Sequence, residues 1–456
     1  MKMILISFLI ILNSISSKEL FEDYYKQAEE ILNNMTIYEK IGQMFISRYS
    51  ADTAIDYIEK YHIGGFCLFA NNLQGHTREQ LNEELANVQN HSKYLLSYSV
   101  DEEGGTVCRV SLYFRDERFP SPRQSYLKGG IPEILKIEKE KRDLLRNLSF
   151  NINFAPVADV SLNESDYIYD RTLGENASMT SEYINAEVDD YVEDEFTCSL
   201  KHFPGYGNNR NTHDDVAHDY RPLDYLKTHD LIPFVKAISH KVPMIMVSHN
   251  IVHSIDGEYP ASISKKMHDL LRNEYNYTGI IITDSLSMGA IEKYAVNVSA
   301  GALAVLAGND IVLTSLFEKH IDQVIKAYNN HEISEEIINK AARRVLAWKL
   351  KYLYKRDVDP TDEPTDEPTD EPTDKQTDEI YNEDSDKDLI LYVFLGVALV
   401  VIGIIIVVLI YCYLKKKKTN EENRNLIDGN EENIDPKENR LVRDTIQSEV
   451  EGQKNN

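Results

Sequence analysis

The sequence is poor in basic residues, in cysteine and in metal-binding motifs, and each shortage excludes a class of protein. Its 456 residues include 49 Lys and Arg against 75 Asp and Glu, which gives a net charge of −26. Nucleic-acid-binding proteins carry clustered positive charge, so this composition argues against a nucleic acid partner. The 4 cysteines are too few for a disulfide scaffold and show no C-x-x-C spacing. Because H-E-x-x-H and Cys/His clusters are also absent, we expect no metal and no other cofactor.

Two apolar segments near the ends of the sequence differ in length. Residues 1–16 combine an early lysine, a short apolar run and small residues, which indicates a signal peptide. The alternative is an uncleaved N-terminal anchor, but the apolar run is short for a helix that spans a membrane. Residues 389–414 form an uncharged run of 26 residues followed by four lysines at 415–418. This pattern indicates a transmembrane helix with the lysines on the cytoplasmic side. Together the segments predict a single-pass type I membrane protein, with its larger part extracellular or lumenal, at the cell surface or in endolysosomes.

The segments on either side of the membrane span are polar. Residues 356–388 contain a PTDE repeat, in which regular prolines prevent a helix and acidic residues repel one another, so we expect an extended, disordered stalk. Residues 415–456 are expected to form a disordered cytoplasmic tail. Within the tail, Glu422, Leu426 and Ile427 have the spacing of an acidic dileucine signal for a sorting adaptor. Chance in a Glu- and Asn-rich tail is the competing explanation.

Glycosylation sequons fit this topology, although such short motifs also arise by chance. All of them precede the stalk and none follows the membrane span, as expected for a glycoprotein with a lumenal N-terminal part. They begin at Asn34, Asn90, Asn147, Asn163, Asn176, Asn276 and Asn297.

Residues 18–355 alternate short apolar runs with amphipathic stretches such as 77–93 and 224–239. Strands that are apolar throughout are typical of a parallel sheet covered by helices. Eight such units favour a single (β/α)8 TIM-type barrel. An open doubly wound sheet is the alternative, but a Gly-rich dinucleotide turn is missing after the first strand. The expected strands are 41–46, 63–69, 95–100, 152–160, 196–202, 244–250, 279–285 and 310–315.

Polar residues follow several of these strands, at the end of the barrel where active sites of this fold lie. They are Asp101, Lys201, His202, His249, Asn250 and Asp284. Asp284 could act as a nucleophile at an anomeric carbon, but it also suits the N-cap of the next helix, which by itself is the simpler interpretation. His213 follows a Pro- and Gly-containing turn in a polar loop, where it is either a general acid/base or an idle surface histidine.

Several segments, in the same order along the chain, resemble the bacterial β-N-acetylglucosaminidases of glycoside hydrolase family 3. The most specific is KHFPGYG at 201–207, with Thr212-His213 behind it and ITDSLSM further on at 282–288. The others are VDEEGGTVCRVS at 100–111, NFAPVADV at 153–160, YDRTLG at 169–174 and SHNIV at 248–252. The resemblance covers about residues 30–354 and implies a (β/α)8 barrel, which agrees with the strand count.

The resemblance also implies an activity and the residues that carry it. The expected reaction is hydrolysis of a terminal β-linked N-acetylglucosamine from a glycan, with retention and through a covalent glycosyl-aspartate. Asp284 matches the nucleophile and His213 the general acid/base of the loop. Residues that match substrate-binding positions are Asp101, Arg109, Arg171, Lys201 and His202. With nothing globular expected after residue 355, the acid would come from the barrel itself, which favours the hexosaminidase branch.

One catalytic position departs from the family pattern. The family loop places an Asp two residues before the histidine, whereas this chain has Asn211. An amide can orient an imidazole, but it cannot stabilise imidazolium with a charge. Asp214 or Asp215 could substitute for the missing carboxylate. The sequence therefore leaves open a slower enzyme, a rewired one, a silent sugar-binding protein, or a β-glucosidase of the same family.

Overall fold

The computed structural model describes residues 18–354, except residues 210, 213–215 and 296–298. The expected signal peptide, stalk, membrane span and cytoplasmic tail lie outside the described residues, as do His213 and Asn297. Within the described part, no helix is both long enough and apolar enough to cross a bilayer.

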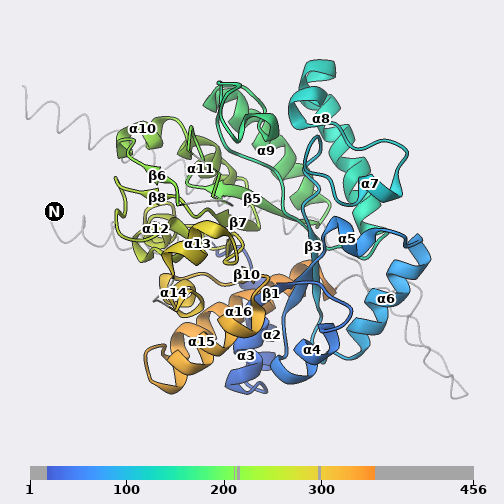
Figure 1. Ribbon diagram of the computed structural model, residues 1–456, viewed down its shortest axis with the longest axis vertical. Helices are drawn as coiled ribbons and strands as arrows, with labels where there is room; N and C mark the ends of the chain where they lie inside the picture. The colour runs from blue at the N-terminus through green and yellow to red at the C-terminus, as the bar shows by residue number, and fades with distance from the viewer. Residues whose placement is uncertain (1–17, 210, 213–215, 296–298, 355–456) are drawn as a thin grey trace, which may run out of the picture. The chain divides into compact units, whose positions relative to one another are not determined.

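Eight parallel strands form a barrel at the centre of the fold (Figure 1). Around the sheet the strands follow the order β10-β1-β2-β3-β4-β5-β7-β9, and a bridge between Ile282 and Ile311 joins its two edges. The predicted TIM-type barrel is therefore confirmed. The strands are β1 (Phe45–Arg48), β2 (Gly65–Cys67), β3 (Ser97–Val100), β4 (Ile152–Asn153), β5 (Thr197–Phe203), β7 (Met244–Val247), β9 (Ile280–Thr283) and β10 (Val312–Thr314). A separate small sheet pairs β6 (His218–Asp219) with β8 (Ile251–Val252).

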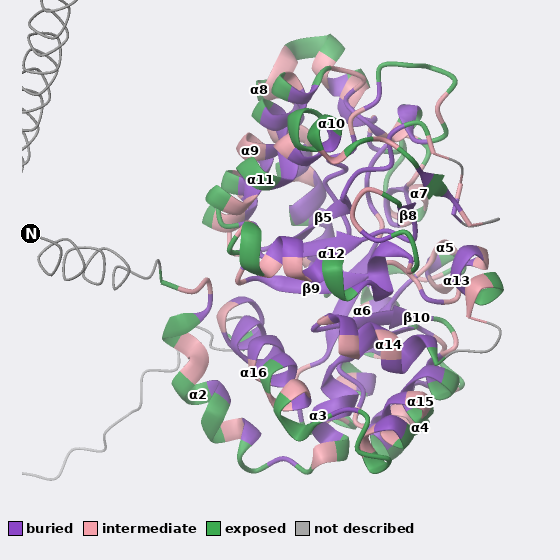
Figure 2. Cartoon of the chain, turned by 90° about the vertical axis from the view of Figure 1, so that its left-hand side faces the viewer, coloured by how far each residue is buried: buried purple, intermediate pink, exposed green. Residues whose placement is uncertain are grey.

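Helices surround the barrel and begin at residues that cap them well. Ser and Thr side chains accept hydrogen bonds from the first turn at Thr36, Thr77 and Ser121, each within a capping box. Figure 2 shows the buried strands inside and the exposed helix faces outside. The longer outer helices are α4 (Ala54–Tyr61), α6 (Arg78–Asn90), α8 (Pro122–Arg146), α9 (Ala177–Glu193), α11 (Leu231–Ser239), α14 (Ala300–Ala307) and α15 (Phe317–Asn329). Shorter ones are α3 (Ile37–Gln43), α5 (Ala70–Leu73), α7 (Ser111–Phe114), α10 (Leu223–Thr228), α12 (Lys265–Asp269) and α13 (Gly289–Tyr294).

Two further helices, α2 (Glu22–Leu32) and α16 (Glu335–Tyr352), close the end of the barrel at which the strands begin. The Trp348 indole Nε1 donates a hydrogen bond to Thr197 Oγ1 over 3.0 Å. The Lys349 ammonium donates to the carbonyl oxygens of Gly64 and Leu95, each at 2.7 Å. Since Thr197, Gly64 and Leu95 lie at or just before the starts of strands, α16 covers this end, and the opposite rim carries the loops that follow the strands.

Two elements differ from the expectation. Residues 41–43 were expected in the first strand, but they complete α3, because Thr36 and Glu39 form a capping box that starts a helix just before them. The stretch 224–239 forms two helices, α10 and α11. Backbone angles of φ −132° and ψ −84° at His229 interrupt the helical path between them.

Candidate active site

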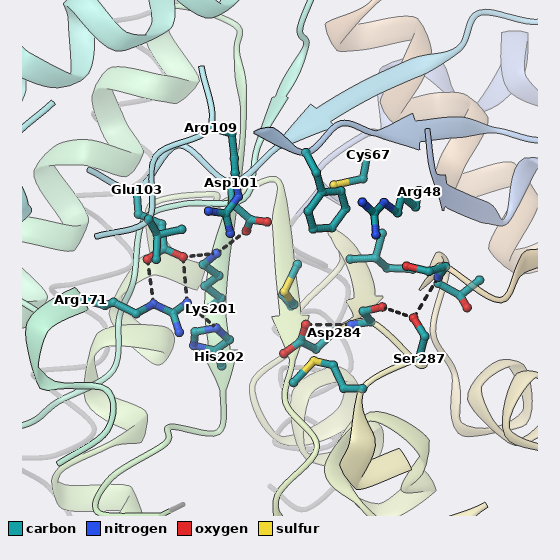
Figure 3. A pocket seen from close by; sticks show the side chains of 18 of the residues that line it. Arg48, Cys67, Asp101, Glu103, Arg109, Arg171, Lys201, His202, Asp284 and Ser287 are labelled. Atoms are coloured by element: carbon teal, nitrogen blue, oxygen red, sulfur yellow. Dashed lines mark hydrogen bonds and ion pairs between the residues drawn. The ribbon is translucent and has the colours of Figure 1, made fainter. Parts of the chain in front are cut away.

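A cavity of about 550 Å³ opens at the C-terminal ends of the strands, where the barrel predicts chemistry. Asp284 and all five residues expected to bind substrate lie in its wall (Figure 3). These five are Asp101, Arg109, Arg171, Lys201 and His202. His249 and Asn250, also expected at this rim, are fully buried outside the cavity lining. The structure thus brings together side chains from four well-separated segments.

Lys201 joins two of the three carboxylates of the DEEGG segment, those of Asp101 and Glu103. Its Nζ lies 2.7 Å from Asp101 Oδ1 and 2.5 Å from Glu103 Oε1. Arg171 holds Glu103 from the other side with Nε and Nη2, at 2.9 and 2.8 Å. The sequence analysis did not identify Glu103 as a site residue. It lies two residues after Asp101, a spacing that can place both side chains on the same side of an extended segment. The resulting chain of alternating charges fixes both cations at the cavity wall.

The pairing keeps these groups charged despite their burial. Burial alone would raise the pKa of Glu103, but Arg171 and Lys201 outweigh it and hold the pKa well below its usual range. Burial would likewise lower the pKa of Lys201, but Asp101 and Glu103 outweigh it and raise the pKa. The wall therefore presents fixed ionic donors and acceptors to a polar ligand at neutral pH.

His202 is oriented by a buried carboxylate. Its Nδ1 lies 2.7 Å from Asp159 Oδ2, and its Nε2 lies 3.2 Å from Arg171 Nη2. Because a guanidinium can only donate, Nε2 must accept, which leaves the proton on Nδ1 for Asp159. These two contacts hold the imidazole ring in one orientation within the charged wall. Asp159 is fully buried, and its position at the end of NFAPVAD was not singled out in the sequence.

Glu102 shapes the turn that presents Arg109. Its carboxylate accepts hydrogen bonds from the backbone N–H groups of Arg109 and Val110, at 2.7 and 2.6 Å. It also accepts from the Ser111 N–H at 3.2 Å and from the Ser111 hydroxyl, and so caps the start of α7. The guanidinium Nε of Arg109 is buried without a hydrogen-bond partner among the described residues. A ligand in the cavity could supply the missing acceptor.

Asp284 follows β9 directly, and both Asp284 and Ser287 line the cavity (Figure 3). Its backbone N–H donates to Val247 O at 2.9 Å, and its Oδ1 accepts from the Ser285 N–H at 2.7 Å. The next helix, α13, begins only at Gly289, with Met288 at its N-cap. The alternative interpretation of Asp284 as the N-cap of that helix is therefore wrong.

Hydrogen bonds hold the backbone of Thr212, the residue before His213, in place. Thr212 is fully buried, its N–H donates to the Tyr206 hydroxyl at 3.0 Å, and its carbonyl accepts from the Ala290 N–H at 3.1 Å. The Tyr206 N–H in turn donates to Asp159 Oδ1 at 2.6 Å. Asn211 is half-buried beside this anchor, whereas His213 lies outside the described residues. Asp159 therefore links the anchor of this loop to the orientation of His202.

The described residues, 18–354 with their gaps, contain no group of three or more His, Cys, Asp or Glu side chains placed to hold a metal ion. Four ionisable side chains of the cavity are instead paired with one another, in the alternating chain of Asp101, Lys201, Glu103 and Arg171. This arrangement can bind hydroxyl groups of a ligand on the wall formed by Asp101, Lys201, Glu103 and Arg171, and it presents the Asp284 carboxylate to the same ligand.

Residues 36–348 match the glycosyl hydrolase family 3 N-terminal domain. β-Hexosaminidase A of Pseudoalteromonas piscicida is 29% identical over 327 residues, which cover 64% of this chain and 54% of that protein. β-Hexosaminidase LpqI of Mycobacterium tuberculosis is 29% identical over 264 residues, 56% of this chain and 68% of that protein. The structure of a family 3 β-N-acetylglucosaminidase from Paenibacillus sp. str. FPU-7 aligns with a TM-score of 0.67 and 26% identity, and covers 76% of this chain and 66% of that one.

The match to the family model spans more than half of the sequence and includes every segment of the cavity described above. The chain spans about half the length of the Pseudoalteromonas relative. It belongs to glycosyl hydrolase family 3, and within that family it is similar to the β-hexosaminidases.

Proposed function

We propose that this protein is a retaining glycoside hydrolase that removes terminal β-linked N-acetylglucosamine from glycans. One observation carries the proposal: Asp284 shares a cavity with the charged wall built from Asp101, Glu103, Arg171 and Lys201. The similarity to named β-hexosaminidases supports N-acetylglucosamine as the sugar.

The charged wall suits the hydroxyl groups of a terminal sugar. Carboxylate oxygens of Asp101 accept from sugar hydroxyls, while Lys201, Arg171 and Arg109 donate to them. Because Lys201 and Arg171 are locked by Glu103, they need little reorganisation to bind. In this arrangement the anomeric carbon faces Asp284.

The proposed reaction has two steps. A carboxylate oxygen of Asp284 attacks the anomeric carbon, the bond to the leaving oxygen breaks, and His213 gives that oxygen a proton. A covalent glycosyl-aspartate results. His213 then takes a proton from water, whose oxygen attacks the anomeric carbon and releases Asp284 with net retention.

Two other functions remain in competition. Because Asn211 replaces the acidic residue of the family loop, the protein could be a catalytically silent sugar-binding protein. The same fold could also support a β-glucosidase. We expect the full-length protein to hydrolyse 4-nitrophenyl β-N-acetylglucosaminide at least about tenfold more efficiently in kcat/KM than the β-glucoside. Steady-state kinetics on this pair checks the expectation. Turnover of neither substrate, with binding of N-acetylglucosamine retained, would favour the silent protein; preference for the glucoside would favour the β-glucosidase.

We also propose that the enzyme is a type I membrane protein with its catalytic domain outside the cell or in the lumen of an endolysosome. Every sequon asparagine among the described residues is exposed, namely Asn34, Asn90, Asn147, Asn163, Asn176 and Asn276. The sequence pattern of residues 389–414 and the sorting signal at Glu422, Leu426 and Ile427 support the same topology.

Protease added to intact cells should release an active fragment by cutting within residues 356–388. Extended acidic segments are the most accessible backbone for proteolysis. Activity in the medium and mass spectrometry of the released C-terminus would measure the cut. Protein lacking residues 389–456, secreted directly, is the control. Protection of the segment in intact cells, together with cleavage of the tail, would contradict the topology.

A further inference from the structure

A buried charged cluster lies where α8 packs against α9 (Figure 1). Its members Glu138, Lys141 and Glu187 are 4%, 1% and 1% exposed. Charged side chains are almost never buried this completely unless they are paired. Two carboxylates and one ammonium therefore share a buried space, and the partners of each group decide what the cluster can do.

Lys141 connects the cluster to the active site. Its ammonium pairs with Glu138 Oε1 and also donates to the backbone carbonyl oxygen of Glu103 over 3.1 Å. A hydrogen bond from a charged donor is stronger than one between neutral groups. Lys141 therefore fixes the backbone of Glu103, while Lys201 and Arg171 fix its side chain from the cavity.

The second oxygen of Glu138 leads to the neighbouring carbonyl group. Glu138 Oε2 accepts from the Tyr191 hydroxyl at 3.0 Å, and that hydroxyl accepts from Asn153 Nδ2 at 3.2 Å. Asn153 Nδ2 also donates to the carbonyl oxygen of Glu102 at 3.1 Å, and its Oδ1 accepts from the Glu102 N–H at 3.0 Å. Both oxygens of Glu138 thus support consecutive residues of the DEEGG segment.

Glu187 lacks comparable support. Its Oε1 is buried without a hydrogen-bond partner among the described residues. It lies four residues before Tyr191 on α9, a spacing that places both on one helix face, so it faces the same cluster. Burial and the nearby Glu138 raise the pKa of Glu187 well above its usual range. Lys141 and Arg142 oppose this change without cancelling it, so Glu187 holds a proton at neutral pH.

Charged and titratable groups surround Glu187 on several elements. Besides Glu138 and Lys141 they are Arg142 of α8, Tyr183, Asp190 and Tyr191 of α9, Cys198 of β5, and Glu102 and Glu103 of the DEEGG segment. Within α11, which also packs on α9, the charged residue is Lys236, and it is exposed. Arg142 already pairs with Asp190 at 2.6 Å and with Asp194 at 2.8 Å. Lys141 is therefore the cation that an ionised Glu187 would attract.

We propose that Lys141 is a positioning residue of the active site, and that the proton on Glu187 is required for Lys141 to hold Glu103. The expected effect on turnover rests on the proposed function. Without that proton, a second carboxylate competes with the neutral carbonyl of Glu103 for the ammonium, and a charged acceptor binds an ammonium more strongly. The DEEGG backbone then loses its support, and the charged wall loses its preorganised geometry. The site should therefore be intact at neutral pH and loosen in alkaline solution.

Glu187→Gln in the full-length protein tests the proton, because the amide has the size of the protonated acid and stays neutral at every pH. The folded native protein holds this proton more tightly than the unfolded chain does, so unfolding should become easier as the pH rises above about 4.3, the usual pKa of Glu. Between about pH 5 and pH 8, the unfolding constant of the native protein should rise relative to that of Glu187→Gln by up to about tenfold per pH unit. Urea unfolding at each pH measures it. Glu182→Gln removes an exposed carboxylate from the same helix and should keep the native profile.

Turnover tests the link to the active site. Dinitrophenyl β-N-acetylglucosaminide needs no general acid in its first step, so its kcat/KM reports the state of the site rather than that of His213. In Glu187→Gln the alkaline loss of kcat/KM should shift upward by at least about one pH unit. The double variant Glu138→Gln/Lys141→Met removes the support without leaving an unpaired buried charge, and should lower kcat/KM at neutral pH about tenfold or more. Lys139→Met, an exposed change on the same helix, should leave it unchanged.

Unfolding constants of native protein and Glu187→Gln that run parallel with pH would overturn the proposal, as would an unchanged alkaline loss of activity. Native kcat/KM in a folded double variant would remove Lys141 from the positioning role. If the native protein turns over no substrate, calorimetric Kd values for N-acetylglucosamine replace kcat/KM. A Kd weakened in the double variant and unaffected in Lys139→Met would then reject the hydrolase and retain the positioning role.

Discussion

Replacing Asp284 with Asn should lower kcat on an aryl β-N-acetylglucosaminide by at least about 10³-fold, because the amide cannot form the glycosyl ester. The side chain keeps its size, and its Oδ1 can still accept the hydrogen bond from the Ser285 N–H. The fold should therefore be retained, with a thermal midpoint within a few degrees of the native protein. The measurements are kcat and thermal unfolding on the same preparations.

A second measurement identifies the nucleophile directly. A 2-deoxy-2-fluoro glycoside with a good leaving group should accumulate as a covalent adduct, and peptide mass spectrometry should place the added mass on Asp284. Asp116→Asn is the matched control, because Asp116 is exposed and does not line the cavity. It should leave both kcat and labelling unchanged. An adduct on any other carboxylate would remove Asp284 from the role.

Replacing His213 with Ala should slow substrates with poor leaving groups by about 10²- to 10⁴-fold, the usual contribution of a general acid. The dinitrophenolate ion leaves a dinitrophenyl glycoside without being protonated, so the rate of the first step should fall little with these substrates. A plot of log(kcat/KM) against leaving-group pKa should therefore become steeper in the variant. Asn211 supplies no negative charge to the imidazolium, so the native enzyme should itself lie at the slower end of the family.

His229→Ala provides the control, because His229 is an exposed histidine that stacks on Tyr225 outside the cavity. Its leaving-group plot should superimpose on that of the native protein. An equal loss across all leaving groups in His213→Ala would mean that His213 only helps to bind the sugar. External azide should restore part of the lost rate with activated substrates, since it can intercept the glycosyl-aspartate without base catalysis.

The sequence predicted the barrel because parallel strands in this fold are apolar along their whole length. All eight expected segments overlap a strand, and the polar residues after several of them meet in one cavity. The first segment was placed too early, because apolar residues 41–43 fit a helix as well as a strand. The capping box at Thr36 decides in favour of the helix.

Residues that act through distant partners were not predicted from the sequence. Glu103 becomes part of the site only because Arg171, 68 positions later, reaches back to it. Asp159 and Tyr206 matter because one orients His202 and the other anchors Thr212. No periodicity or local motif encodes such pairings, since they depend on which strand tips the closed barrel places side by side.

The packing of α2 against α16 ties the beginning of the barrel domain to its end. Lys18 and Lys351 line one shared hollow there, so the two ends of the domain meet. During synthesis, the apolar interior around Trp348 cannot be completed until residues 335–352 have left the ribosome. A nascent chain therefore displays an incomplete barrel until this last helix has emerged.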